Sequence, residues 1–182
     1  MTRRLILDYF WLACKYSVVV TFIALIVRGF IFLPIPVEGN SMNTTLKQND
    51  WVLVEKFTKI KRFDVVVFQL SDGNTYIKRV IGLPGETVSY KDDQLYIDGK
   101  KVAEPYLTEN KQNDQNQNSY TNDFSLEELM NVDKLGKDSY FVIGDNRRVS
   151  KDSRSFGAIS EDQIIGKAFF VYYPIKDVKW IQ

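Results

Sequence analysis

Thr75-Tyr-Ile-Lys-Arg-Val-Ile81 and, just before it, Phe63-Asp-Val-Val-Val-Phe-Gln-Leu70 are the two stretches that decide the fold of this chain. Both are rich in β-branched and aromatic residues, which favour the pleated, half-buried surface of a β-sheet. The four residues between them, Ser71-Asp-Gly-Asn74, are typical of a turn. The sequence therefore predicts two neighbouring β-strands joined by a short turn.

The same pattern recurs on both sides of this pair. Further strands are predicted at residues 51–57, 86–90, 94–98, 101–103, 140–143 and 164–173. Strand following strand, without alternating helices, favours a mostly β fold built on an antiparallel sheet. Thr108–Asp123 is polar and rich in Asn and Gln, so we expect a solvated loop there. Ser125, with Glu128 three residues later, has the pattern of a capping box and predicts one short helix.

Residues 16–33 form a long apolar segment. Its length suits a single transmembrane helix, and Arg3, Arg4 and Lys15 before it place the N-terminus in the cytoplasm by the positive-inside rule. A cleaved signal peptide is the main alternative, but residues 32–36 hold bulky side chains and two prolines instead of a small-x-small cleavage site. A buried core helix is a further alternative, disfavoured because the segment is apolar all round instead of striped.

These boundaries divide the chain, whose 182 residues leave room for one compact domain besides an anchor. We expect a cytoplasmic N-terminus over residues 1–15 and a membrane anchor over 16–33. Residues 34–90 and 138–182 would form the β core, and residues 91–137 an insertion with a hairpin, the polar loop and the short helix. Everything after the anchor would then lie on the extracytoplasmic face.

Composition excludes several kinds of site. The 24 basic and 23 acidic residues give a net charge of +1, so the sequence indicates no nucleic-acid partner. Cys14 is the only cysteine, which excludes an intrachain disulfide and a cysteine-based zinc cluster. The absence of histidine excludes a Ser-His-Asp triad, a Cys-His dyad and nearly every catalytic zinc site. Lysine, carboxylates or tyrosine remain for proton transfer, and we predict neither a metal nor a cofactor.

Ser41 and Lys78 are the first candidates for chemistry. Ser41 lies in the Gly/Asn-rich segment 37–46, where a serine commonly does no more than satisfy local hydrogen bonds. Strand alternation puts Lys78 and Arg79 on opposite faces, so one of them must point toward apolar surroundings. Either the strand is an edge strand with exposed or inward-turned charges, or Lys78 is a buried general base. The second interpretation requires burial to lower its pKa by about two to three units.

A polar cluster near the end of the chain, residues 142–157, is the third candidate. It reads Val-Ile-Gly-Asp-Asn-Arg-Arg-Val-Ser-Lys-Asp-Ser-Arg-Ser-Phe-Gly and predicts a densely hydrogen-bonded loop after a strand. It could also be only an elaborate polar turn or an anion site that uses Arg147, Arg148 and Arg154.

The three candidates occur in a recognisable order. The segments are Ser41-Met-Asn-Thr-Thr-Leu46, Arg62-Phe-Asp-Val-Val-Val-Phe68, Tyr76-Ile-Lys-Arg-Val-Ile-Gly-Leu-Pro-Gly-Glu86 and the Gly144-Asp-Asn-Arg147 box, followed by Ser150, Asp152-Ser-Arg154 and Phe156-Gly157. In these motifs the sequence resembles the bacterial type I signal peptidases, in their compact Gram-positive-like form. The resemblance runs from the anchor to the last strand and is weakest between Thr108 and Lys137.

The resemblance implies a serine endopeptidase with a Ser/Lys dyad. Ser41 would attack the scissile carbonyl, and neutral Lys78 would take its proton and return it to the leaving amine. The backbone N–H of Ser41 would serve the oxyanion, and Ser150 would hydrogen-bond and orient the lysine. Three further residues would brace the site: Asp145, Asp152 and Arg154.

Two positions depart from the family pattern. Some members carry a hydroxyl oxyanion donor where this chain has Gly39, and loss of one such donor can lower the rate on the order of a hundredfold. The family has proline where this chain has Thr44, and threonine relaxes the constraint on the backbone after the nucleophile.

The resemblance also implies the partners, which are preproteins with signal peptides and membrane lipid. A substrate bound as an extended strand would place its −1 and −3 residues in neighbouring shallow pockets that accept only small side chains, the Ala-x-Ala pattern. The expected pocket walls are Ile35, Val37, Met42 and Tyr76.

Two alternatives for the function remain open. One is a weakly active or inactive paralogue that acts as an accessory factor for surface proteins, and the other is a self-cleaving regulator, which would need a DNA-binding head.

Overall fold

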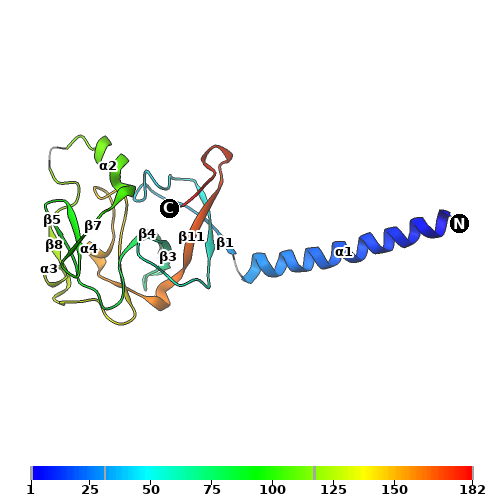
Figure 1. Ribbon diagram of the computed structural model, residues 1–182, viewed down its shortest axis with the longest axis horizontal. Coiled ribbons are helices and arrows are strands. Elements are labelled where there is room, and N and C mark those ends of the chain that lie inside the picture. Colours follow the sequence, from blue (N-terminus) through cyan, green and yellow to red (C-terminus); the bar gives the residue numbers. More distant parts are fainter. Residues whose placement is uncertain (1, 31, 117, 182) are drawn as a thin grey trace.

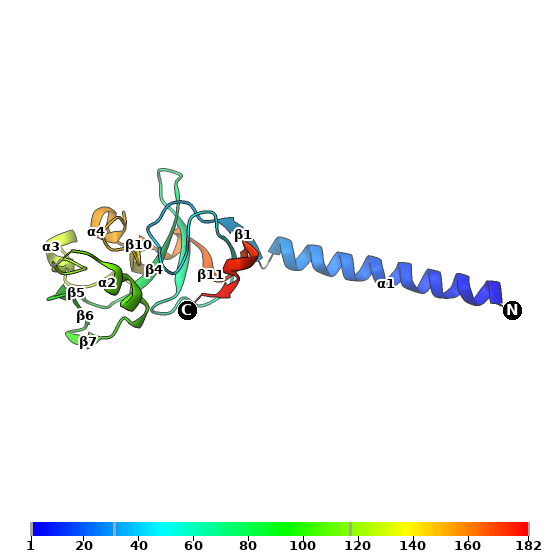
Figure 2. The same ribbon diagram turned by 90° about the horizontal axis from the view of Figure 1, so that it is seen from above.

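The computed structural model describes residues 2–30, 32–116 and 118–181, with only the backbone for residues 2, 3, 6, 23–30 and 32. A long N-terminal helix, α1 (Thr2–Phe30), projects from a body built of β-strands, and the two views at right angles agree on this (Figures 1 and 2). Where the structure describes the chain, none of its helices is both long and apolar enough to cross a membrane.

The predicted bounds of the N-terminal helix need correction. The helix begins at Thr2, because residues 2–15 contain no glycine or proline that would stop it. Leu33, predicted to end the helix, lies instead in strand β1 (Phe32–Pro36), whose two prolines are tolerated at the edge of a sheet. Residue 31, within the predicted anchor, lies outside the described residues.

The larger sheet has the strand order β1-β2-β11-β3-β4-β9-β10, with β12 paired to β11. Every recorded pair in it is antiparallel, as the sequence predicts. Its strands after β1 are β2 (Trp51–Glu55), β3 (Val65–Gln69), β4 (Thr75–Gly82), β9 (Ser139–Ile143), β10 (Ile159–Ser160), β11 (Ile164–Tyr173) and β12 (Lys179–Trp180).

A smaller sheet has the order β7-β6-β5-β8. Its strands are β5 (Val88–Lys91), β6 (Gln94–Ile97), β7 (Lys100–Val102) and β8 (Phe124–Ser125). The predicted hairpin at 86–98 is therefore present as β5 and β6. Side chains of this sheet pack in one apolar cluster with Ile81, Phe141 and Ile143 of the larger sheet, so the two sheets share a core.

The prediction that Thr108–Asp123 forms a solvated loop is partly wrong. A 3₁₀ turn (Pro105–Leu107) leads into helix α2 (Thr108–Asn113), and Asn110, Tyr120 and Thr121 are buried. Their polar atoms find hydrogen-bond partners in other loops, which is why burial does not require apolar side chains here.

The short helix predicted from the capping box is confirmed as α3 (Leu126–Met130). The Ser125 hydroxyl accepts from Glu128 N, and the Glu128 carboxylate accepts from Ser125 N. The remaining helical turns are α4 (Ser153–Phe156) and the 3₁₀ turns Glu161–Gln163 and Ile175–Asp177.

Strand β4 lies inside the sheet, paired with β3 on one side and β9 on the other. The edge-strand interpretation of Lys78 and Arg79 is therefore wrong. Both faces of β4 are covered, and the side chains of Lys78 and Arg79 are both buried. Since alternate residues face opposite sides, one strand delivers a buried cation to each face of the sheet.

Candidate active site

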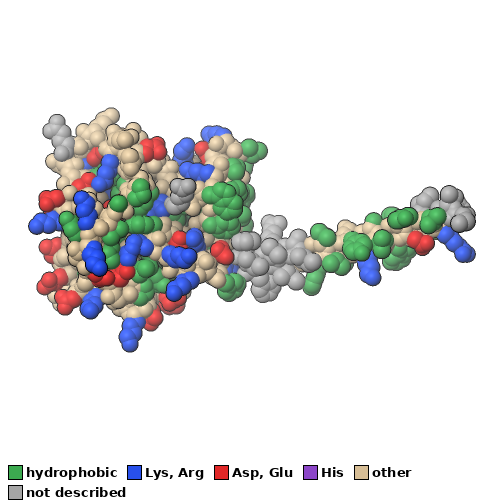
Figure 3. Space-filling view, viewed as in Figure 1, with side chains coloured by type: hydrophobic (Ala, Val, Ile, Leu, Met, Phe, Trp, Pro, Cys, Tyr) green, Lys and Arg blue, Asp and Glu red, His purple; other side chains and the backbone are tan. Residues whose placement is uncertain are grey.

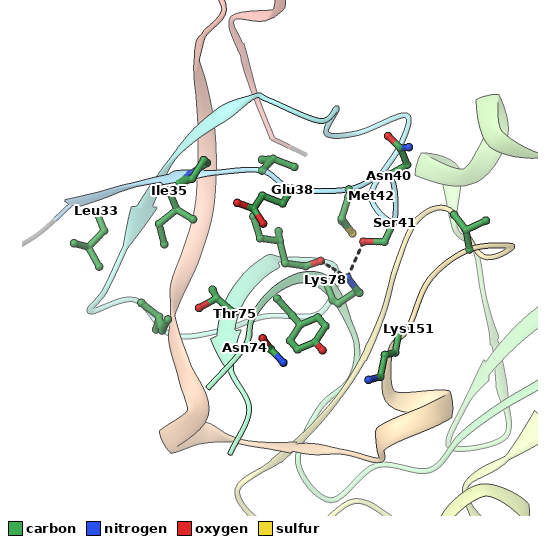
Figure 4. Close-up of a pocket in the computed structure, with 17 residues that line it drawn as sticks. Leu33, Ile35, Glu38, Asn40, Ser41, Met42, Asn74, Thr75, Lys78 and Lys151 are labelled. Carbon is green, nitrogen blue, oxygen red and sulfur yellow. Dashed lines mark hydrogen bonds between the residues drawn. The ribbon is translucent and has the colours of Figure 1, made fainter. Parts of the chain in front are cut away.

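The side chains of Ser41 and Lys78 are in contact. The Lys78 Nζ donates to Ser41 Oγ over 2.7 Å and to the carbonyl of Ile77 over 2.9 Å (Figure 4). Ser41 comes from the loop between β1 and β2, and Lys78 from the middle of β4. When the amine is neutral, the same contact lets Nζ accept the serine hydroxyl proton, which is the geometry that a general base requires.

Burial changes the acid–base properties of Lys78. Its side chain is 3% exposed. Burial lowers the pKa of Lys78 from 10.5 to about 8, although the charges of Asp152 and Asp145 oppose the shift. With that pKa, roughly one lysine in ten is neutral at pH 7. The lowered pKa that the sequence interpretation required is therefore present.

Asp145 ties the sheet to the loop that carries Ser41. Arg79 donates to it through two nitrogens, Nε to Oδ1 over 2.9 Å and Nη2 to Oδ2 over 2.7 Å. Thr45 Oγ1, four residues after Ser41, donates to the same carboxylate over 2.5 Å. The side chains of both partners are 1% exposed, so the ion pair forms a buried support under the loop that carries Ser41.

Asp152 supports the neighbouring loop. It accepts from Gly144 N over 3.0 Å and from the guanidinium of Arg154 over 2.8 Å, and it caps the N-terminus of α4. Burial would raise the pKa of Asp152, but the hydrogen bonds and charge of Arg154 outweigh it, so its pKa lies below the usual value. Asp152 therefore stays ionised beside the dyad.

Gly144 allows the two loops to approach each other. A Cβ at this position would lie 2.6 Å from the carbonyl oxygen of Ser41 and would clash with the Ser150 hydroxyl. In addition, Asn146 N donates to the Ser41 carbonyl over 3.0 Å. The backbone of Ser41 is thus held directly by the Gly-Asp-Asn-Arg loop.

A pocket of about 880 Å³ opens beside the dyad. Its lining includes Ser41, Lys78 and all four of the expected wall residues, Ile35, Val37, Met42 and Tyr76. Figure 4 shows Ile35 from β1 and Thr75 from β4 on opposite sides of the space, with Glu38 and Lys151 adding charges to its lining. The lining residues that the sequence interpretation missed include Leu33, Thr75, Ile165 and Val149.

Comparison with known proteins gives a consistent result. The family model described as signal peptidase, peptidase S26, matches residues 11–173. The chain belongs to the S26 signal peptidase family.

Individual members of the family are similar over nearly the whole chain. Signal peptidase I V of Bacillus subtilis is 48% identical over 162 residues, which cover 86% of this chain and 94% of the relative. Signal peptidase IB of Staphylococcus aureus is 42% identical over 173 residues, 90% of each chain. A crystal structure of a signal peptidase I from Enterococcus faecalis superposes with a TM-score of 0.58 at 43% identity and covers 60% of this chain and 97% of its own. The antiparallel β fold of this S26 peptidase thus matches that of a solved signal peptidase I.

Ser150 of this S26 peptidase departs from expectation in its contacts. Among the described residues its buried hydroxyl makes no hydrogen bond to Lys78, so the expected bond is absent. The hydroxyl interacts instead with Asp152 and helps to lower the pKa of that carboxyl. Ser150 lies against Gly144, next to the dyad.

Gly39 and Thr44, the two departures from the family pattern, lie in different surroundings. Gly39 lines the pocket with φ of +77°, and a Cβ there would meet no atom within 4 Å. A side-chain donor at this position is therefore opposed by the backbone conformation and not by space. Thr44, in contrast, is half-buried and hydrogen-bonded to Asn110, a residue that sequence reasoning missed because an asparagine in an Asn-rich segment gives no distinguishing signal.

Proposed function

We propose that this S26 peptidase is a membrane-anchored Ser/Lys endopeptidase that cleaves N-terminal signal peptides from exported preproteins after small residues. The observation that carries the proposal is the 2.7 Å contact between Ser41 Oγ and the buried Lys78 Nζ, at the wall of an open pocket. It gives a nucleophile and a base in a chain without histidine.

The reaction follows from this contact. Ser41 Oγ attacks the scissile carbonyl while Lys78 Nζ accepts the hydroxyl proton. Lys78 then gives that proton to the leaving amine nitrogen, which departs and leaves an acyl ester on Ser41. A water molecule next attacks the ester carbonyl and gives a proton to Lys78 Nζ. The bond between the acyl carbon and Ser41 Oγ then breaks, Lys78 returns the proton to Oγ, and the signal peptide leaves with a free carboxyl group. The Ser41 N–H serves the oxyanion, and Asp145, Asp152 and Arg154 hold the two loops in place.

Substrate selection follows from the shape of the pocket. A preprotein segment bound in extended form directs alternate side chains to the same side, so its −1 and −3 residues enter the space lined by Ile35, Val37, Met42 and Tyr76. In this proposal the two subsites accept only small side chains, which gives the Ala-x-Ala preference.

Membrane attachment is the third part of the proposal. In this arrangement α1 is a single-pass anchor with a cytoplasmic N-terminus, and the β body lies on the extracytoplasmic face. Figure 3 shows hydrophobic side chains gathered at the end of the body nearest α1. Trp51, Tyr173 and Trp180 on the neighbouring strands β2, β11 and β12, and Ile175 in the turn between β11 and β12, are exposed. Tryptophan and tyrosine favour the membrane–water interface, so this surface suits contact with lipid.

Cleavage of a preprotein by the purified full-length chain in detergent tests the dyad. With an Ala-x-Ala preprotein, Ser41→Ala and Lys78→Met are expected to abolish cleavage, whereas Ser71→Ala and Lys59→Met, at exposed positions, retain it. The logarithm of kcat/KM should rise with pH and level off above about pH 8, where Lys78 is neutral. Normal cleavage by either dyad variant, or an acidic optimum, would show that the assignment is wrong.

A further inference from the structure

Asn110 of α2 is a buried polar residue that the mechanism so far does not use. It is 8% exposed, and its amide nitrogen donates to the carbonyl of Asn43 over 2.5 Å. The same nitrogen lies 3.3 Å from the carbonyl of Asp145 and 3.1 Å from the Tyr120 hydroxyl. The side chain thus joins the loop that carries Ser41 to the loop that carries Asp145.

Its amide oxygen contacts Thr44. Thr44 Oγ1 donates to Asn110 Oδ1 over 2.9 Å, and Thr44 N lies 3.4 Å from the same oxygen. A proline at position 44 has neither an N–H nor a hydroxyl, so it could make neither contact. The contact therefore depends on the residue that distinguishes this chain from the family pattern.

Tyr120 also contacts the loop that carries Asp145. Its hydroxyl donates to the carbonyl of Asp145 over 3.1 Å and accepts from Arg147 N over 3.2 Å. Asn110 and Tyr120 lie ten positions apart in the insertion, and both are buried against the catalytic loops. On the other side of Thr44, Thr45 is held by Asp145, so two consecutive residues of the nucleophile loop are fixed by side chains from elsewhere in the fold.

We infer that Asn110 is a positioning residue for Ser41. Its hydrogen bonds to Asn43 and Thr44 constrain the backbone two and three residues after the nucleophile, where the family uses the fixed φ of proline. The inference rests on the proposed role of Ser41 as nucleophile. It assigns to the insertion, where the family resemblance is weakest, a function in holding the dyad.

Variants at Asn110 and Thr44 test the inference in the full-length chain. Asn110→Ala is expected to lower kcat about 10- to 100-fold, because small displacements of a nucleophile cost that much, and to change KM by less than about threefold. The pH at which kcat/KM levels off should stay unchanged, since Lys78 keeps its surroundings. Asn113→Ala, at an exposed position of the same helix, is the matched control and should keep the wild-type kcat.

The second arm distinguishes positioning from general stability. Thr44→Pro is expected to restore kcat to within about fivefold of wild type in the Asn110→Ala background, because proline supplies the constraint that the lost hydrogen bonds had supplied. A residue that only stabilised the fold would not be rescued in this way. Thr44→Val, which loses only the hydroxyl, provides a milder variant if Asn110→Ala does not fold, and it should lower kcat with little change in KM.

The outcomes separate this inference from the proposed function. If Ser41→Ala is inactive while Asn110→Ala and Thr44→Val both keep the wild-type kcat, the positioning role is wrong and the dyad stands. If Asn110→Ala loses kcat and Thr44→Pro does not restore it, the role through Thr44 is wrong. If Ser41→Ala cleaves normally, the proposed function itself fails.

Discussion

Lys78 combines a functional requirement with a cost in stability. Burial lowers its pKa from 10.5 to about 8, so between these values the folded protein has released a proton that the unfolded chain still holds. The unfolded state then binds more protons, and the stability of the fold rises with pH across this window by about 1.4 kcal/mol per unit. Below pH 8 the folded protein bears the whole cost of a buried charged amine, because the lysine is protonated in both states.

The first prediction concerns this linkage. Lys78→Met lacks the titrating group, so its stability relative to wild type should be greatest below pH 8 and should fall by about 3 kcal/mol as pH rises toward 10.5. Denaturant unfolding of the two proteins at several pH values between 7 and 10 measures the difference. Lys59→Met, at an exposed lysine, serves as the control. A difference that stays constant with pH would contradict the lowered pKa.

The second prediction concerns Gly144, where an added Cβ would displace the loop that carries Ser41. An added Cβ would lie 2.6 Å from the Ser41 carbonyl oxygen, so Gly144→Ala should push the nucleophile loop away and lower kcat about 100-fold. Steady-state cleavage of a preprotein checks this. Gly136→Ala is the matched control, since its Cβ would meet only the side chain of Ser139, with the hydroxyl at 2.9 Å. If Gly144→Ala cleaves as fast as this control, the loops tolerate the displacement.

At the scale of elements, β4 organises the site because it lies between β3 and β9 and places one cation on each face of the sheet. On the face opposite Lys78, Arg79 stacks on the Tyr106 ring at 4.1 Å and pairs with Asp145. Lys78 and Arg79 are both buried because β4 is an inner strand of the sheet. β4 is an inner strand because it pairs with β9, which lies far along the chain. The alternation within residues 75–81 carries no information about that pairing.

The ion pair on that face supports the third prediction. Asp145→Asn removes the carboxylate charge that pairs with the buried Arg79 and should destabilise the fold by about 3 to 5 kcal/mol. Chemical denaturation at pH 7 measures the change. Lys167→Met breaks the pair with Asp64, where the lysine is 28% exposed, and should cost about 1 kcal/mol or less. Equal losses in the two variants would show that burial does not set the strength of these pairs.

Elements differ in how far the sequence predicts them. Strands such as β3, β4 and β11 are predicted nearly to the residue, because alternation and β-branched composition are local properties. β1 was missed because Pro34 and Pro36 are unusual in strands, and its pairing with β2 is a tertiary effect. α2 was missed because its residues are polar, and the partners that bury Asn110 lie 66 and 67 positions away in the nucleophile loop. The motifs single out Ser41 and Lys78, which the structure places in contact, but they carry no information about the hydrogen bonds that hold the loop of Ser41.

For the whole molecule, Arg147 links the smaller sheet to the catalytic loops. Its guanidinium pairs with Glu104 over 2.6 Å and contacts the hydroxyls of Tyr90 and Thr121, with a side chain 1% exposed. Tyr90 lies in β5, whereas Glu104 and Thr121 lie before and after α2. Separating the two sheets would break these contacts, so they favour folding of the two sheets together.

The fourth prediction concerns the arrangement of the whole chain in a membrane. If α1 is a single-pass anchor with a cytoplasmic N-terminus, an impermeant maleimide should label Cys14 only from the cytoplasmic side. On a Cys14→Ser background, Ser71→Cys in the exposed β3–β4 turn should be labelled only from outside. Right-side-out and inverted vesicles give the comparison. Labelling of both positions from the same side would contradict a single crossing.

The junction between Asn110 and Thr44 limits how parts of this protein can be exchanged with those of relatives. The amide of Asn110 is buried against a loop 66 residues earlier in the chain, so the two segments are matched to each other. A chimaera that received only the insertion of a relative, or only its nucleophile loop, would bring together groups that did not evolve as a pair. Grafts between such peptidases should therefore transfer the insertion and the loop of Ser41 together, although the two segments lie far apart in the sequence.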